Sequence, residues 1–161
     1  MTSRVLRPAT ANDVDLLYSW RNDPGARENS FSREVIDGTS HGRWFEAKLE
    51  AREETRIWIL VEEGVPVGQI RYDRSNASVA NISLSIDSRF RGRGLGTEIL
   101  RLSAPRACQE LGVQELCGLV KATNGASIVA FERAGFRRGA DRIVNGDIAV
   151  VFLWDCGAGR V

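Results

Sequence analysis

The feature that most constrains this chain is a glycine-rich segment, Arg91-Gly-Arg-Gly-Leu-Gly96. An apolar strand pattern over residues 79–86 precedes the segment, and a helical pattern begins at Leu95. Glycines at a helix start let backbone N–H groups approach an anion, and the helix N-terminus adds partial positive charge. The glycines would weaken a helix start that had no such task. The segment therefore predicts a phosphate-binding loop.

Other phosphate-binding loops do not fit this spacing. A P-loop needs a Gly-Lys-Ser/Thr sequence, and the segment contains no lysine. The dinucleotide fingerprint GxGxxG follows the first strand of its fold, whereas GxGxG here follows several expected strands. Arg91 and Arg93 add formal positive charge to the loop. The alternative that remains is a flexible turn with solvated arginines.

Hydrophobic periodicity divides the chain into short strands and helices. The expected strands are residues 4–8, 57–62, 65–73, 79–86, 115–121 and 147–154, and the expected helices are residues 10–22, 41–52, 95–111 and 124–133. Pro105 removes a backbone hydrogen bond and should kink or split its helix. Residues 25–39 show no clean period and are expected to form a loop or a loose short helix. The length fits a single domain over residues 1–161.

Composition narrows the classes of function. The formal net charge of +1 creates no overall attraction to nucleic acid or to an anionic membrane, so we expect neither partner. No apolar run reaches the length of about eighteen residues that a membrane span needs. Cys108, Cys117 and Cys156 show no CxxC spacing and no disulfide pattern. We therefore expect no metal site, and reduced, packed thiols in a cytoplasmic protein.

Two motifs together resemble a known family. Arg91-x-x-Gly94-x-Gly96 is similar to the R/Q-x-x-G-x-G/A loop of the GNAT acetyltransferase superfamily. Asn124-Gly-Ala-Ser-Ile-x-x-Phe-Glu-x-x-Gly-Phe136 is similar to the second signature of that family. The resemblance implies an α+β fold with a mixed, mostly antiparallel, twisted sheet of about six to seven strands and about four helices. It also implies acetyl-CoA as co-substrate, no metal, and the homodimers that relatives often form.

The resemblance assigns cofactor contacts. These residues are Leu84, Ser85, Ile86, Arg91, Gly92, Arg93, Gly94, Leu95, Gly96, Asn124, Ser127, Phe131 and Arg133. In the family, the amides of the glycine loop hold the CoA pyrophosphate, and the strand before it pairs with the pantetheine arm. That strand splays from the next one and opens a wedge for the thioester. Helix capping is the alternative role for Asn124 and Ser127, and core packing is the alternative for Phe131.

The implied reaction is direct attack of a neutral amine on the thioester, which needs a proton acceptor and a donor to the carbonyl oxygen. Family likeness makes a backbone N–H within residues 84–86 the expected donor. Many relatives have a glutamate base where this chain has Asn81 and a tyrosine acid where it has Phe131. Neither residue here exchanges a proton, so the acid and base stay open. The catalytic candidates are Ser85, Asn81 and His41, and further candidates acting through water are Asp23, Tyr72 and Ser83.

The acceptor side has short motifs of its own. Residues 20–24 and His41-x-x-Trp44-Phe45 resemble a GNAT branch that acetylates the 4-amino group of UDP-linked sugars in pseudaminic acid synthesis. This branch borders enzymes that acetylate ribosomal-protein N-termini. The candidate substrate-binding residues are Arg21, Asn22, His41, Trp44 and Tyr72. Arginine suits a diphosphate or carboxylate, and tryptophan suits a sugar face or base. A helix stop, core packing and a structural histidine are the alternative interpretations.

These observations predict an acetyl-CoA-dependent N-acetyltransferase, with a nucleotide-linked amino sugar as the favoured acceptor. The alternative acceptors are protein N-termini, polyamines and aminoglycosides. Polycations usually need an acidic cleft, and no acidic cluster stands out between residues 18 and 45. A non-catalytic acyl-CoA-binding sensor is the alternative from another class, because Asn81 and Phe131 replace the usual proton-transfer groups.

Overall fold

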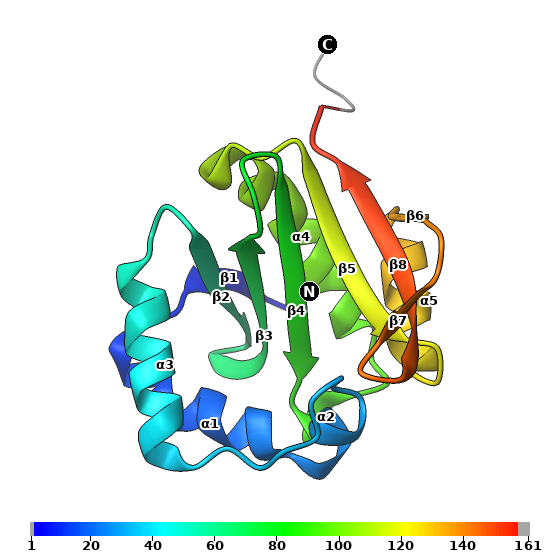
Figure 1. Ribbon diagram of the computed structural model, residues 1–161. Coiled ribbons are helices and arrows are strands. Elements are labelled where there is room, and N and C mark those ends of the chain that lie inside the picture. The colour runs from blue at the N-terminus through cyan, green and yellow to red at the C-terminus, as the bar shows by residue number, and fades with distance from the viewer. Residues whose placement is uncertain (1, 158–161) are drawn as a thin grey trace.

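A computed structural model describes residues 2–157 of the protein. They form an eight-stranded sheet in the order β1-β2-β3-β4-β5-β8-β6, with β7 paired to β8 (Figure 1). The strands are β1 (Arg4–Pro8), β2 (Thr55–Glu62), β3 (Val65–Arg74), β4 (Val79–Ile86), β5 (Glu115–Lys121), β6 (Arg137–Arg138), β7 (Arg142–Val144) and β8 (Asp147–Asp155). The α-helices are α1 (Val14–Asn22), α2 (Pro24–Glu28), α3 (Gly38–Glu50), α4 (Leu95–Leu111) and α5 (Gly125–Ala134). Only β4 and β5 pair in parallel.

Side chains that alternate along the strands supply two separate cores. On one face, Trp58, Ile70 and Leu116 pack with the apolar sides of α4 and α5. On the other face, Ile57 and Ile59 pack with residues from α1 and α3. The helices α1 and α3 lie toward the β1–β3 side of the sheet, and α4 and α5 lie behind it (Figure 1). The second face therefore stays less covered over β4 and β5.

The parallel pair separates partway along its length. β4 pairs with β5 only from Val79 opposite Glu115 to Ile82 opposite Gly118. Beyond that point, β4 stays paired with β3 as far as Ile86, and β5 stays paired with β8 as far as Lys121. The split therefore lies just after Ile82 and Gly118, as the family resemblance predicts.

A glycine at the split allows an aromatic ring to approach. A Cβ atom added to Gly118 would lie 2.5 Å from the nearest ring carbon of Phe131. Phe131 also stacks on Phe152, with ring centroids 5.1 Å apart, and meets Phe136 edge-on. This cluster anchors α5 behind the point where the strands separate.

The expected fold class is confirmed, and several details differ. Helix α2 overlaps the segment expected to form a loop or a loose short helix, and with the short strands β6 and β7 the structure has eight strands and five α-helices among residues 2–157. The helix containing Pro105 is not split, since α4 continues from Leu95 to Leu111. Pro105 removes one backbone hydrogen bond from α4. The apolar residues before and after Pro105 are buried, and their packing stabilises the continuous helix. No helix among the described residues is long and apolar enough to cross a membrane.

The expectation of three reduced thiols is wrong. Cys108 in α4 and Cys156 just after β8 form a disulfide with Cα atoms 5.5 Å apart. The pair is separated by 48 residues in sequence, so no local spacing reveals it. Cys117 is free and buried. Tertiary packing alone brings the two distant cysteines together.

Candidate active site

The glycine loop has unengaged backbone donors. Gly92 and Gly94 have φ angles of 77° and 75°, the left-handed region that favours glycine. Within the described part of the chain, no hydrogen bond is donated by a backbone N–H of residues 91–94. Helix α4 begins directly afterwards, with Gly94 as its N-cap. Free N–H groups beside a helix N-terminus form a suitable site for a diphosphate.

The edge of β4 at the split also has unpaired backbone groups. Asp87 donates its backbone N–H to the Val67 carbonyl on β3, at 2.9 Å. Because peptide groups alternate sides along a strand, those of Leu84 and Ile86 face the separated β5 instead. The Ile86 carbonyl accepts a hydrogen bond from Arg91 Nε at 3.0 Å. The N–H groups of Leu84 and Ile86 thus remain for an extended ligand arm or a carbonyl oxygen.

Arginine side chains fasten the loop to neighbouring elements. Arg91 Nη2 lies 2.9 Å from Asp23 Oδ2, and Asp23 also caps α2 through the Ala26 N–H. Arg93 Nη2 lies 2.6 Å from Glu62 at the end of β2. The side chains therefore hold the loop from two sides. The family resemblance predicts that the backbone amides of the loop, and not these guanidinium groups, donate hydrogen bonds to the pyrophosphate.

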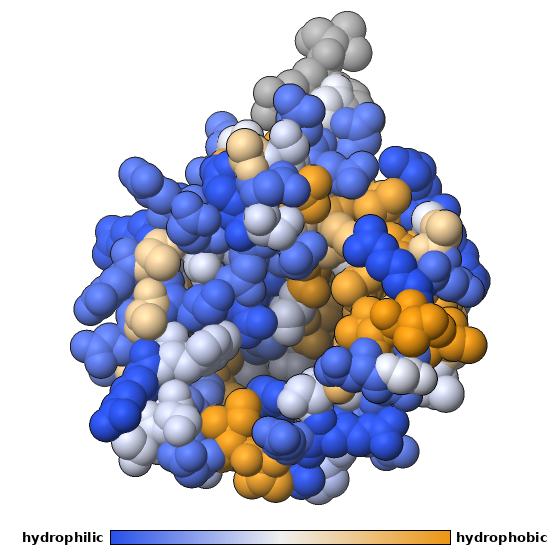
Figure 2. All heavy atoms as spheres, viewed as in Figure 1, coloured by the Kyte–Doolittle hydropathy of each residue, from blue (hydrophilic) through white to orange (hydrophobic). Residues whose placement is uncertain are grey.

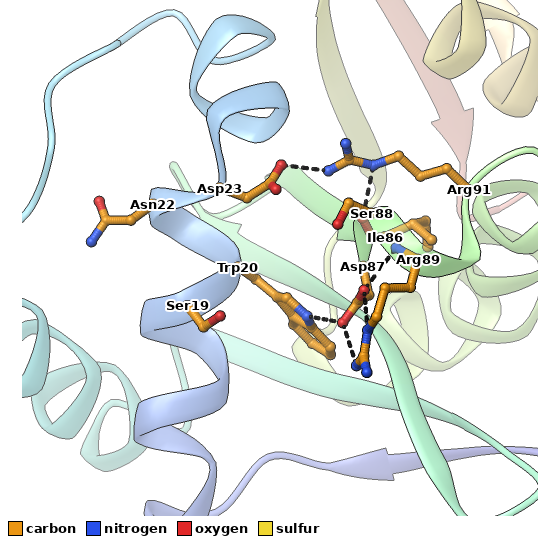
Figure 3. A pocket seen from close by; sticks show the side chains of 9 residues that line it. All are labelled: Ser19, Trp20, Asn22, Asp23, Ile86, Asp87, Ser88, Arg89 and Arg91. Atoms are coloured by element: carbon orange, nitrogen blue, oxygen red, sulfur yellow. Dashed lines mark hydrogen bonds and ion pairs between the residues drawn. The ribbon is translucent and has the colours of Figure 1, made fainter.

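A pocket of about 360 Å³ lies where α1 meets the end of β4 (Figure 3). Its lining residues are Ser19, Trp20, Asn22, Asp23, Ile86, Asp87, Ser88, Arg89 and Arg91. Figure 3 shows the Arg91–Asp23 ion pair on one side and the Asp87 carboxylate bound by Trp20 and Arg89 on the other. The pocket thus joins the acceptor-side helix to the phosphate loop.

Asp87 is the most heavily bonded carboxylate in this pocket. It accepts hydrogen bonds from Trp20 Nε1 at 2.9 Å and from Arg89 Nε and Nη2 at 3.1 and 3.0 Å. The Arg89 guanidinium, helped by Trp20 and the Arg89 N–H, holds the pKa of Asp87 far below its usual range, although burial opposes the shift. The buried ring of Trp20 links α1 to the end of β4 through this carboxylate.

Asp87→Asn should lower the free energy of unfolding at pH 7 by about 1–3 kcal/mol, since it removes charge-assisted hydrogen bonds. A depressed folded-state pKa means that the carboxylate stabilises the fold fully above its unfolded value of about 3.9 and loses this effect as pH falls below that value. The difference in free energy of unfolding between wild type and variant should therefore become smaller at acid pH. Urea unfolding at about pH 7 and pH 3 measures it, with the exposed Asp141→Asn as control. An equal gap at both pH values would contradict this role.

The candidate acceptor residues occupy different places. Asn22 holds the segment before α3, because its side-chain amide exchanges two hydrogen bonds with the Ile36 backbone at 2.9 and 3.0 Å. Trp44 is 38% exposed, and the Arg71 guanidinium lies over its ring, with Cζ 4.8 Å from the ring centroid. Tyr72 is fully buried on the opposite face, bonded to Ser103 at 2.7 Å, and burial raises its pKa. We therefore leave Tyr72 out of the proposed acceptor site.

The catalytic candidates also separate in space. Asn81 is exposed on β4, opposite Cys117 on β5 and one residue before the split. Ser85 lies past the split, where its hydroxyl accepts a hydrogen bond from Gln69 at 3.1 Å. His41 is buried between Tyr18, Trp44 and Phe45, and its Nε2 has no partner among the described residues. Burial lowers the His41 pKa, so the ring is neutral at pH 7.

The second signature motif lies at and along α5. Asn124 caps α5 by accepting a hydrogen bond from the Ser127 N–H at 3.2 Å. Phe131 packs in the core, and Arg133 is exposed near the end of the helix. These positions agree with the alternative structural roles of Asn124 and Phe131, while contacts with CoA remain predictions.

The sequence analysis missed two cationic side chains near the split. Arg71 on β3 lies opposite Ser83, on the less covered face of the sheet. Lys121 at the end of β5 is 2% exposed and donates to the Glu28 carbonyl at 2.9 Å. A charged residue at the end of an otherwise apolar strand, as in Leu-Cys-Gly-Leu-Val-Lys121, is the signal that could have singled out Lys121. Nothing local distinguishes Arg71 from a solvated strand residue.

The less covered face is concave. Figure 2 shows it hollowed near its centre, with mostly hydrophilic side chains toward α1 and α3 and apolar ones toward the β7–β8 side. The unpaired edge of β4 and the polar side chains of Asn81 and Ser83 belong to this region of the sheet. The glycine loop with its unengaged N–H groups, the split strand pair and the hollow beside them together form the candidate active site.

Comparison with solved structures shows the same fold over almost the whole chain. AAC(6′)-Ib in complex with ribostamycin and coenzyme A superposes with a TM-score of 0.82 at 20% identity, covering 99% of this chain and 98% of that chain. RimL, a ribosomal alpha-N-protein acetyltransferase in complex with coenzyme A, gives 0.82 at 15% identity and covers 97% and 96%. Spermidine N-acetyltransferase from Vibrio cholerae, in complex with CoA and spermine, gives 0.83 at 13% identity and covers 96% of both chains.

The family itself follows from the sequence. No curated protein matches the chain as a sequence relative. Residues 4–137 match the family model described as the acetyltransferase (GNAT) domain, which spans well over half of the chain. With this match, and with the loop and split described above, the chain belongs to the GNAT acetyltransferases.

Proposed function

We propose that this GNAT N-acetyltransferase binds acetyl-CoA along the loop and the split, and transfers the acetyl group to the primary amine of a small molecule. The observation that carries this proposal is the set of unengaged N–H groups in residues 91–94, directly before α4. Converging backbone amides beside a helix N-terminus are a well-suited set of donors for a diphosphate. The free edge of β4 continues from the loop toward the split.

The residues at the split orient the reacting groups and do not themselves exchange protons. An amine held in the hollow attacks the thioester carbon, the C–S bond breaks, and CoA leaves as a thiolate. The N–H groups of Leu84 and Ile86 are the available donors to the developing oxyanion. Asn81 and Ser83 can orient a water that accepts the amine proton. Because a thiolate is a fair leaving group, Phe131 in place of an acid is compatible with turnover.

We propose the acceptor as a chemical class, a small molecule with a primary amine. AAC(6′)-Ib, RimL and spermidine N-acetyltransferase are named for an aminoglycoside, a ribosomal protein and a polyamine. None of the three is named for a UDP-linked sugar, which the acceptor-side motifs favoured. A small amine fits the sequence resemblance, AAC(6′)-Ib and spermidine N-acetyltransferase, and a protein N-terminus, as in the name of RimL, is the alternative acceptor.

Free thiol released from acetyl-CoA tests the activity. The protein should cleave the thioester steadily in the presence of an amine from a panel of amino sugars, polyamines, amino acids and N-terminal peptides. Calorimetry with CoA measures the binding step separately. Tight CoA binding without amine-dependent cleavage by any member would favour the acyl-CoA sensor, which Asn81 and Phe131 make the second candidate. Failure to bind CoA would remove both proposals.

A further inference from the structure

A pair of arginines lies beside the hollow without a matching pair of counter-ions. Arg21 is the penultimate residue of α1, and no carboxylate of a described residue lies within 4.0 Å of its guanidinium. Its guanidinium makes one hydrogen bond to a described residue, a long contact of 3.5 Å to the Ser32 carbonyl. Burial, together with the charges of Arg71 and Arg27, lowers the pKa of Arg21. Arg21 therefore lies in a half-buried, positively charged neighbourhood that disfavours its own charge.

Arg71 is held rigidly in the same neighbourhood. Its Nε donates to Asp73 at 2.6 Å, and its guanidinium lies over the Trp44 ring at 4.8 Å. Asp73 also binds Lys48 and Thr55, at 2.8 and 2.9 Å, so this carboxylate is shared by several donors. The terminal Nη groups of Arg71 make no hydrogen bond to a described residue. A guanidinium fixed through Nε, with its Nη edge unused, is preorganised for an oxyanion.

The pair lies close to the reaction point. Arg71 is opposite Ser83, the first β4 residue beyond the last pairing with β5. Residues directly opposite on antiparallel strands have Cα atoms about 5 Å apart, so Arg71 is one strand away from the split. Arg21 precedes Asp23 by two residues, and Asp23 binds the loop residue Arg91. An amine at the split could therefore place another of its groups against these arginines.

We infer that Arg21 and Arg71 bind an oxyanion, either a carboxylate or a phosphate, carried by the amine acceptor. This inference rests on the proposed function and specifies its substrate class. The ring of His41 lies 5.4 Å from that of Tyr18, three residues before Arg21 on α1, and 5.7 Å from that of Trp44, over which Arg71 lies. The two arginines therefore border the same group of aromatic side chains, and an anion bound between them would be attracted by both charges.

The same charges disfavour a polycationic acceptor. Along β3 and β4, the side chains that face the hollow are Gln69, Arg71, Asp73, Asn81, Ser83 and Ser85. Asp73 is the carboxylate in this set, and it is already bound by Lys48 and Arg71. At the end of β5, the ammonium group of Lys121 adds another positive charge, with Asp147 as its partner at 3.5 Å. Like charges held at short range select against spermidine and similar amines.

The binding test uses protein saturated with CoA, so that the phosphate loop is already occupied. γ-Aminobutyrate and O-phosphoethanolamine offer an amine with a carboxylate or a phosphate. n-Butylamine and ethanolamine are their counterparts without the anion, and spermidine represents the polycations. We expect at least one anionic amine to bind by calorimetry. Its kcat/KM, measured by thiol release from acetyl-CoA, should exceed that of its counterpart and of spermidine by roughly tenfold or more. Comparison of γ-aminobutyrate with O-phosphoethanolamine shows whether the site prefers a carboxylate or a phosphate.

Variants assign the effect to the arginines. Arg21→Ala and Arg71→Ala should each lower kcat/KM for the preferred anionic amine by roughly tenfold or more, mainly through KM. The kcat/KM of the matched amine that lacks the anionic group should stay unchanged. Arg21→Lys keeps the charge and should restore part of the loss. Arg52→Ala removes an exposed arginine whose side chain has no hydrogen bond or ion pair to a described residue, and it should change neither value.

Several results would overturn the oxyanion site. One is equal kcat/KM for the anionic amines and for the counterparts that lack the anion, and another is a preference for spermidine. The others are equal losses for both kinds of amine in the arginine variants, and absence of binding by both anionic amines. Thermal unfolding of each variant shows whether it folds, and the lysine variant keeps the test valid if an alanine variant does not. Loss of CoA binding by the wild-type protein would instead overturn the proposed function, so the two failures are distinguishable.

Discussion

Gly94→Val is expected to weaken CoA binding by roughly tenfold or more, because the new side chain would stand among the amides that face the diphosphate. Gly94 has a φ angle of 75°, and its added Cβ would meet no atom of the protein within 4 Å. The space around this position is therefore open to a ligand. The dissociation constant of CoA, measured by calorimetry on the folded variant, checks the prediction.

The same helix provides a matched control. Gly112, at the C-terminal end of α4, has a φ angle of 65°, and its added Cβ would also meet nothing within 4 Å. Gly112→Val should therefore carry a similar backbone strain, roughly 1–2 kcal/mol, without touching the phosphate loop. Both variants should lose similar thermal stability, and only Gly94→Val should lose CoA affinity. Unchanged CoA affinity in folded Gly94→Val would count against residues 91–96 as the phosphate site.

Reduction of the Cys108–Cys156 disulfide is expected to lower the free energy of unfolding by about 2–4 kcal/mol. The bond closes a loop with a sequence separation of 48 residues, so it restricts the unfolded chain considerably. For a chain of this size, the melting temperature should fall by roughly 5–15 °C. Differential scanning calorimetry of the protein with and without a thiol reductant measures the change.

A double variant isolates the disulfide from other effects of the reductant. Cys108→Ala with Cys156→Ala should melt near the temperature of the reduced wild type, and reductant should not shift it further. The buried thiol of Cys117 stays in both proteins, and burial raises its pKa, which keeps it unreactive. Alkylation under denaturing, non-reducing conditions should label one cysteine in the wild type. Labelling of all three, together with an unchanged melting temperature, would show that the bond does not form.

Short-range signals predicted the parts of the site that depend on local chemistry. The glycine loop could be singled out as a candidate phosphate site because glycines that follow a strand and begin a helix have few other uses. Asn124 lies at the start of α5, where its side chain caps the backbone, which is the alternative role that its residue type favours. Asp23 was interpreted only as part of a helix stop, and the structure shows that it also caps α2. The turn Asn145-Gly146 is a typical hairpin signal with positive φ at both residues, and giving it more weight would have found β7.

The acceptor side was less predictable, because its residues come from separate elements. Arg21, Trp44 and Arg71 belong to α1, α3 and β3. Tyr72 and Arg71 are neighbours in sequence, yet one is buried against α4 and the other faces the hollow. Period-2 alternation separates the two faces of a strand but does not say which face a helix will cover.

Local sequence was thus sufficient for the order of the longer strands and helices, for the glycine loop and for the family, since each depends on neighbouring residues and backbone preferences. The packing of distant elements decided the disulfide, the burial of His41 and Lys121, and the placement of Arg71 over the Trp44 ring. These features depend on which faces of helices and strands meet, and that choice minimises the free energy of the whole chain rather than of any one segment.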